Sequence, residues 1–147
     1  MYMCNKAASK ALFFACCLLA SAVLASCGSM NKGEKKKENL LMTVEAFNSA
    51  FKWEDYNAAG MFIAPGKKEQ FWKEVDLFKG KIRITDVQIR DVDYIDNSPS
   101  GTVILWVQYF RTSLPTLQTV TFRQRWYFLE EEKHWQLVES GFQAISK

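Results

Sequence analysis

The chain has 147 residues, with 19 Lys and Arg against 16 Asp and Glu, 48% hydrophobic residues and 14% aromatic residues. This length and balance are typical of one globular domain and exclude wholesale disorder. After the first thirty residues the sequence has no run of the ~20 apolar residues that a membrane span needs, which excludes a polytopic membrane protein. From Asn39 to Lys147 there are 13 basic and 14 acidic residues, a balance that does not indicate a nucleic-acid-binding surface.

All four cysteines lie within the first 27 residues, so they do not form a disulfide framework for the rest of the chain. Lys6 and Lys10 precede an apolar run over residues 11–25 that contains no acidic residue. A basic start followed by a short apolar segment is typical of an export signal. An uncleaved membrane anchor is the alternative, but the run is short for a span and small residues precede Cys27.

The segment Leu24-Ala25-Ser26-Cys27 resembles the bacterial lipobox, in which a branched aliphatic residue and two small residues precede a cysteine. The resemblance implies that residues 1–26 are a lipoprotein signal peptide and that the sulfur of Cys27 receives a diacylglyceryl group. Each buried CH₂ contributes ~0.8 kcal/mol, so two or three acyl chains anchor a protein durably. Gly28 and Ser29 lack the Asp that favours inner-membrane retention, so the expected location is the outer membrane, facing the periplasm. A Gram-positive host would place the protein outside its cytoplasmic membrane.

Residues 27–38 are predicted to form the lipidated cysteine and a polar tether. Residues 29–38 contain four Lys and two Glu. A solvated spacer is one interpretation. The other is a Lys cluster that binds anionic lipid head groups, at ~1 kcal/mol per Lys near such a surface.

Three helices are predicted after the tether. The first covers residues 38–53, where apolar residues recur at helical spacing. These are Leu40, Leu41, Val44, Phe47 and Phe51. Asp55 is placed to cap a short second helix that ends before Pro65. A third helix follows this break, and Gly80 stands where a left-handed cap would end it.

From Lys81 the apolar period changes from 3.6 to 2, which predicts four strands. In the first strand the parity slips after Ile84 and again after Ile89, which predicts two β-bulges and a curved sheet. Helices precede strands without βαβ alternation, which is typical of an α+β fold. We therefore expect three N-terminal helices packed on the concave face of a curved four-stranded antiparallel sheet.

The element order and the closing hairpin resemble the nuclear transport factor 2-like (NTF2-like), or cystatin-like cone, superfamily. The hairpin runs from Gln124-Arg125-Trp126 to Trp135-Gln136-Leu137-Val138, and the resemblance covers residues 39–138. It implies that residues 39–147 form an NTF2-like domain. The superfamily contains isomerases, dehydratases, cyclases, secretion-system subunits and binding modules, so the fold alone does not determine an activity.

Enzymes of that superfamily that resemble ketosteroid isomerase or scytalone dehydratase place Asp, Tyr or His inside the cone. His134 is the only histidine here, and it follows a charged loop that favours a solvent position. With one His and no Cys after Cys27, metal sites and Cys-His or Ser-His-Asp catalysis lack the residues they need, and no cofactor is expected. The remaining catalytic alternative is an inward carboxylate, with Asp86 the candidate, acting with a Tyr such as Tyr109.

Gln124 is the one polar residue on the inward face of its predicted strand. It is either a core amide with an internal partner or a group that orients a ligand in the cone. The candidate pocket for an apolar ligand consists of Gln124, Phe122, Trp126, Tyr109 and Phe71.

These patterns favour a lipid-anchored, non-catalytic cell-envelope domain that binds a protein partner or a small apolar ligand. The alternatives are an isomerase-like or dehydratase-like envelope enzyme and a subunit of a secretion or envelope assembly. A homodimer is also predicted through the outer face of the sheet. The apolar residues expected side by side there are Ile104, Trp106, Phe110, Tyr127 and Leu129. Cover by Phe142 and Ile145 of the C-terminal tail is the alternative.

Overall fold

The computed structural model describes residues 31–146. The helices and strands of these residues all belong to one compact unit, Lys32–Lys147. The predicted export signal, the lipobox and Cys27 lie outside the described residues. None of the helices within residues 31–146 is both long and apolar enough to cross a membrane.

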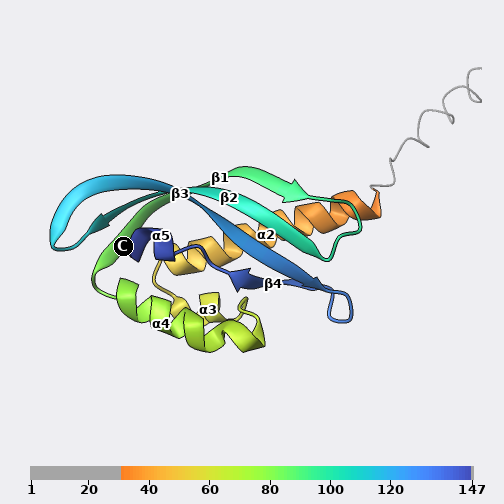
Figure 1. The fold of residues 1–147 in the computed structure, drawn as a ribbon, viewed down its shortest axis with the longest axis horizontal. Helices are drawn as coiled ribbons and strands as arrows, with labels where there is room; N and C mark the ends of the chain where they lie inside the picture. The colour runs from red at the N-terminus through yellow and green to blue at the C-terminus, as the bar shows by residue number, and fades with distance from the viewer. Residues whose placement is uncertain (1–30, 147) are drawn as a thin grey trace, which may run out of the picture. The chain divides into compact units, whose positions relative to one another are not determined.

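Helices come first in this unit and strands follow (Figure 1). The helices are α2 (Lys32–Lys52), α3 (Tyr56–Gly60) and α4 (Lys68–Phe78), with a 3-10 turn over Pro65–Lys67 between the last two. Asp55 caps α3, since its carboxylate accepts a hydrogen bond from the Ala58 amide at 3.0 Å. Gly80 follows α4 in the left-handed region, with φ +72°. Both predicted helix ends are confirmed.

The first helix begins at Lys32, six residues before the predicted start at Glu38. The reason is tertiary. The Lys36 ammonium lies 4.1 Å from the centroid of the Phe128 ring and 2.5 Å from the Glu130 carboxylate, and the Trp135 indole N–H donates to the Lys36 carbonyl at 3.2 Å. These contacts hold the first turns against the closing hairpin. The segment from Lys32 onward is therefore helix, not the tether expected over residues 27–38.

The sheet contains β1 (Ile82–Tyr94), β2 (Ser100–Arg111), β3 (Leu114–Leu129) and β4 (His134–Glu139), antiparallel and in sequence order. The register of β1 on β2 shifts between Ile84 and Asp86 and between Ile89 and Asp91, which confirms both predicted bulges. The sheet curves over the helices, which lie on one side of it (Figure 1). The predicted α+β class is confirmed.

The core fills the space between the helices and the concave face of the sheet. Inward residues of β2 alternate with half-exposed ones, and its buried side chains are Val103, Leu105, Val107 and Tyr109. A β-carbon on Gly101 would lie 2.7 Å from Cδ2 of Leu40. The absence of a side chain at Gly101 therefore leaves room for Leu40 of α2 to pack against β2.

The C-terminal tail enters this core and ends in the short helix α5 (Gln143–Ser146). Phe142 is buried, and its ring stacks on Phe51 with centroids 4.0 Å apart. Ile145 is also buried. The tail therefore belongs to the concave side, and the prediction that Phe142 and Ile145 cover the outer face is wrong.

The outer face of the sheet is not the continuous apolar patch that was predicted. The register places Thr121 beside Trp106 and Arg123 beside Ile104, whereas Tyr127 pairs with Ser100 at the other end of β2. A guanidinium also lies over the Trp106 ring, with Cζ of Arg90 5.3 Å from the ring centroid. Polar side chains thus separate the expected members of the patch, and self-association through this face stays a prediction.

Candidate functional site

Gln124 has an internal partner, Asn48 of α2. The Gln124 side-chain amide donates to Oδ1 of Asn48 at 3.0 Å, and Nδ2 of Asn48 donates to Oε1 of Gln124 at 3.2 Å. Nδ2 of Asn48 also donates to the Val44 carbonyl at 2.8 Å. Gln124 is 0% exposed and Asn48 4%. Gln124 is therefore a core amide with an internal partner and not a group that orients a ligand, because its side-chain hydrogen bonds are made to Asn48.

The other residues of the candidate pocket, Phe122, Trp126, Tyr109 and Phe71, are all buried. Rings from other elements lie against three of them. Phe47 packs edge-on against Trp126 at 5.7 Å and lies 6.4 Å from Phe71, while Phe142 packs edge-on against Phe122 at 5.6 Å. The structure therefore brings these side chains together as aromatic core.

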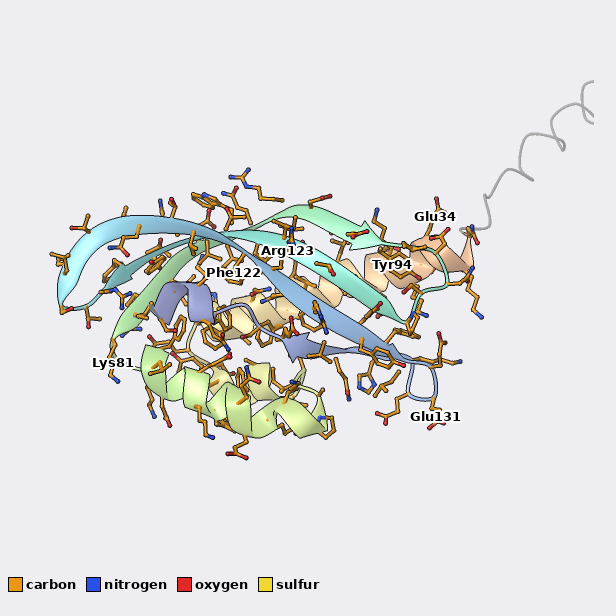
Figure 2. All side chains as sticks on the ribbon, in the orientation of Figure 1. Glu34, Lys81, Tyr94, Phe122, Arg123 and Glu131 are labelled. Atoms are coloured by element: carbon orange, nitrogen blue, oxygen red, sulfur yellow. The ribbon has the colours of Figure 1, made fainter. Side chains whose placement is uncertain are left out.

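Figure 2 marks Phe122 and its neighbour Arg123 on β3. Phe122 is buried in the core and Arg123 is exposed, as the alternation of a half-buried strand requires. The indole N–H of Trp126, on the same inward face as Phe122, has no hydrogen-bond partner within residues 31–146. It is the one fully buried side-chain polar atom of the candidate pocket without a hydrogen-bond partner in the described structure.

A groove of about 610 Å³ lies between α2 and β1. Asn48, Ser49 and Lys52 of α2 line one side, and Val87, Gln88 and Ile89 of β1 line the other. Trp53 stands at the groove with 76% of its surface exposed. This α2–β1 groove thus combines apolar side chains with hydrogen-bonding ones, and Gln124 fixes the orientation of Asn48 from behind. Sequence reasoning missed it, because its two sides come together only when α2 docks on the sheet.

The groove lies beside a sheet edge that no other strand covers in the described residues. At the opposite edge, the amide of Ala64 donates to the Leu137 carbonyl at 3.0 Å and the amide of Leu137 donates to the Phe62 carbonyl at 2.8 Å, so a loop covers β4. Along β1, the carboxylate of Asp86 accepts from the Val87 amide at 2.9 Å and that of Asp91 accepts from the Val92 amide at 2.8 Å. Each bulge therefore carries its own acceptor.

The catalytic alternative needed an inward carboxylate near a Tyr. Asp86 pairs with Gln108 in the β1–β2 register, one position from Tyr109, and successive residues of a strand face opposite sides. Asp86 and Tyr109 thus lie on opposite faces of the sheet, so the structure does not bring together the carboxylate and the Tyr of this alternative. His134 is half-exposed, with Nδ1 3.4 Å from Glu132 and Nε2 3.1 Å from the Gln136 amide nitrogen.

Buried polar groups also lie outside the α2–β1 groove, at Tyr56 and around Glu74. Burial raises the pKa of Tyr56, the negative charge of Glu54 raises it further, and Arg83 opposes the shift. On α4 the buried carboxylate of Glu74 accepts from the Ser140 hydroxyl at 2.5 Å and from the Gln70 amide at 3.2 Å, which fixes the turn before Phe142. Within residues 31–146 no group of three or more His, Cys, Asp or Glu side chains is placed to hold a metal ion.

No protein-family model matches the sequence, and no curated protein matches it. A solved structure of a ketosteroid isomerase-like protein from Erwinia carotovora atroseptica SCRI1043 is similar to the chain with a TM-score of 0.54 and 11% identity, over 68% of this chain and 88% of that chain. A protein from Xanthomonas campestris pv. campestris, described as a candidate polyketide cyclase, has a TM-score of 0.46 and 14% identity, over 69% and 87% of the two chains. The first likeness shows the fold, an α+β NTF2-like cone.

Proposed function

We propose that the protein is a lipid-anchored, non-catalytic domain of the cell envelope that binds a protein partner or a small apolar ligand in the α2–β1 groove. The observation that carries this proposal is the hydrogen-bonded pair of Asn48 and Gln124. The pair satisfies the buried amide of Gln124 internally and at the same time orients Asn48, which lines an open groove. The proposed binding site is therefore the α2–β1 groove on the side of the cone and not the interior of the cone.

Aromatic rings fill the interior of the cone, and this packing favours a binding site on its side, in the α2–β1 groove, over one inside it. Phe47, Phe71 and Phe142 lie against the side chains that an internal ligand would have to touch. Opening a cavity there would separate packed rings, and loss of such contacts costs several kcal/mol in protein cores, ~3–5 kcal/mol for removal of one Phe. A ligand that enters the α2–β1 groove meets no such cost.

The chemistry of the α2–β1 groove suits a ligand or segment with apolar and hydrogen-bonding parts. Its volume of about 610 Å³ lies within the range of about 300–1,000 Å³ found for ligand sites. Val87 and Ile89 supply apolar surface, and Ser49 and Gln88 supply hydrogen-bonding groups. The exposed ring of Trp53 offers the kind of aromatic anchor that dominates many binding interfaces.

The lipid anchor rests on the lipobox-like segment 24–27 and on the signal before it. Lys32, where α2 begins, follows Cys27 by five residues, which span at most about 18 Å when extended. An acyl anchor on Cys27 would therefore keep the folded domain close to the lipid surface. The expected location is the outer membrane, on its periplasmic side.

Site-specific crosslinking in the host tests the binding site. A photoreactive benzoylphenylalanine replaces Trp53 at the α2–β1 groove in one variant and Trp72 on α4 in the control, since both rings are exposed. We expect a covalent adduct of one defined mass from position 53 and none from position 72. Equal adducts from both positions, or adducts only from position 72, would remove the groove from the proposal. If the protein chemically converts the compound identified in this way, the enzyme alternative would replace the proposed binding function.

A further inference from the structure

A second groove, of about 570 Å³, lies at the start of α2. Lys32, Lys35 and Lys36 of the helix line it together with Asn97 of the β1–β2 turn and Phe128 and Lys133 of the β3–β4 hairpin. Figure 2 shows Glu34, Tyr94 and Glu131 at this same end of the unit. We call this feature the lysine groove. It is built by three segments that are far apart in the sequence.

Defined contacts hold the lysine groove in shape. The Phe128 ring is buried beneath the ammonium of Lys36, which also pairs with Glu130. A β-carbon at Gly33 would lie 2.6 Å from Oδ1 of Asp96, so the absence of a side chain at Gly33 lets the β1–β2 turn approach the helix. The walls are therefore positioned by packing, and the lysines project from a fixed framework.

The lining of the lysine groove has an excess of positive charge. Four of its residues are Lys and one, Glu130, is acidic. Lys37, Glu34, Glu38, Glu131 and Glu132 are nearby in sequence, and the carboxylate of Asp96 lies against Gly33, so this end as a whole has five Lys against six acidic residues. Attraction of an anion is thus local to the groove, and it requires a compact anionic group that reaches the lysines past the acidic side chains.

The position of the lysine groove in the chain indicates where such an anion comes from. Lys32 follows Cys27 by five residues, or at most about 18 Å of extended chain. Asn48 at the α2–β1 groove lies twelve residues beyond Lys36, about 18 Å further along the helix. A lipid on Cys27 therefore keeps the lysine groove within reach of the head groups, whereas the α2–β1 groove lies further along the helix from the anchor.

We propose that the lysine groove binds the phosphate of an anionic lipid head group in the membrane that anchors the protein. The inference rests on the proposed lipidation of Cys27. Lys35 and Lys133 approach the phosphate from the helix and from the hairpin, so the contact fixes the orientation of the domain on the membrane. An acyl anchor alone leaves the domain free to rotate about its attachment.

The test uses the mature lipoprotein isolated from host membranes, with acylation of Cys27 first measured by mass spectrometry. It is placed in nanodiscs of phosphatidylcholine alone or of phosphatidylcholine with phosphatidylglycerol, and amide hydrogen exchange is followed in residues 32–39 and 130–134. With the anionic lipid we expect exchange to slow by about fivefold, the change expected for one Lys contact at such a surface. The double variant Lys35→Gln/Lys133→Gln should lose this protection, and the control Lys67→Gln/Lys79→Gln, on exposed sites of other elements, should keep it.

The outcomes separate the two proposals. An acylated protein with equal exchange in both kinds of nanodisc overturns the head-group site and leaves the lipid anchor intact. Protection by inorganic phosphate added to phosphatidylcholine nanodiscs, without further protection by phosphatidylglycerol, makes the site one for free phosphate and also overturns the inference. A Cys27 without an acyl group removes the proposed anchor and, with it, the basis of this inference.

Discussion

Asn48 on α2 and Gln124 on β3 exchange two side-chain hydrogen bonds across 76 residues of sequence, at 3.2 and 3.0 Å. The pair lies inside an otherwise apolar core and fixes the position of the helix on the sheet. A buried amide without a partner costs about 1–3 kcal/mol, so each member depends on the other.

Replacement of Gln124 by Leu is therefore expected to lower the free energy of unfolding by about 1–3 kcal/mol, because Oδ1 of Asn48 loses its donor. The double variant Asn48→Leu/Gln124→Leu should lose less than the sum of the two single variants, since neither partner is then left unsatisfied. Urea unfolding followed by circular dichroism measures all four proteins. A free energy of unfolding of Gln124→Leu at or above that of wild type would contradict the role of the pair.

Gly101→Ala is expected to destabilise the protein by about 1–3 kcal/mol, because the new methyl group would lie 2.7 Å from Cδ2 of Leu40. Gly66→Ala is the matched control, since a β-carbon there meets nothing within 4 Å. Thermal unfolding of both variants decides the matter. Equal melting temperatures would show that α2 does not approach β2 as closely as described.

The double variant Asp86→Ala/Asp91→Ala is expected to self-associate more readily than wild type. It removes the acceptors of the Val87 and Val92 amides and two charges from an uncovered edge strand, and such edges recruit further strands. Light scattering over time measures the effect, with Asp93→Ala on the same strand as the control. If both variants stay as dispersed as wild type, the two carboxylates do not protect this edge.

A chain that begins at Lys32 is expected to be more stable than one that begins at Asn39. The shorter chain loses the Lys36 side chain from the Phe128 ring and leaves the buried indole N–H of Trp135 without its acceptor, at a cost of about 1–3 kcal/mol. Thermal melting of the two truncated proteins compares them. Identical melting temperatures would return residues 32–38 to the role of a tether.

Cys27→Ala is expected to abolish incorporation of radiolabelled palmitate and association with the membrane fraction, because the sulfur that accepts the diacylglyceryl group is removed. Wild-type protein expressed in parallel is the control. Label and membrane association that both survive the substitution would remove the lipid anchor from the proposed function.

Local patterns in the sequence determined the element types, the cap at Asp55, the left-handed residue Gly80 and the bulges after Ile84 and Ile89. Each of these depends on residues within a few positions of one another. A parity slip, a capping side chain or a glycine acts on the neighbouring backbone, so its effect can be inferred without knowledge of the rest of the chain.

Only the tertiary structure decided the partner of Gln124, the start of α2 and the place of Phe142. The sequence shows Gln124 as an inward polar residue, but its partner Asn48 lies on α2, and no local pattern relates that helix to β3. Lys36 became helical through contacts with Phe128 and Glu130 on a hairpin more than ninety residues away. Such contacts depend on strand register and helix docking, which set distances between residues that no local period relates.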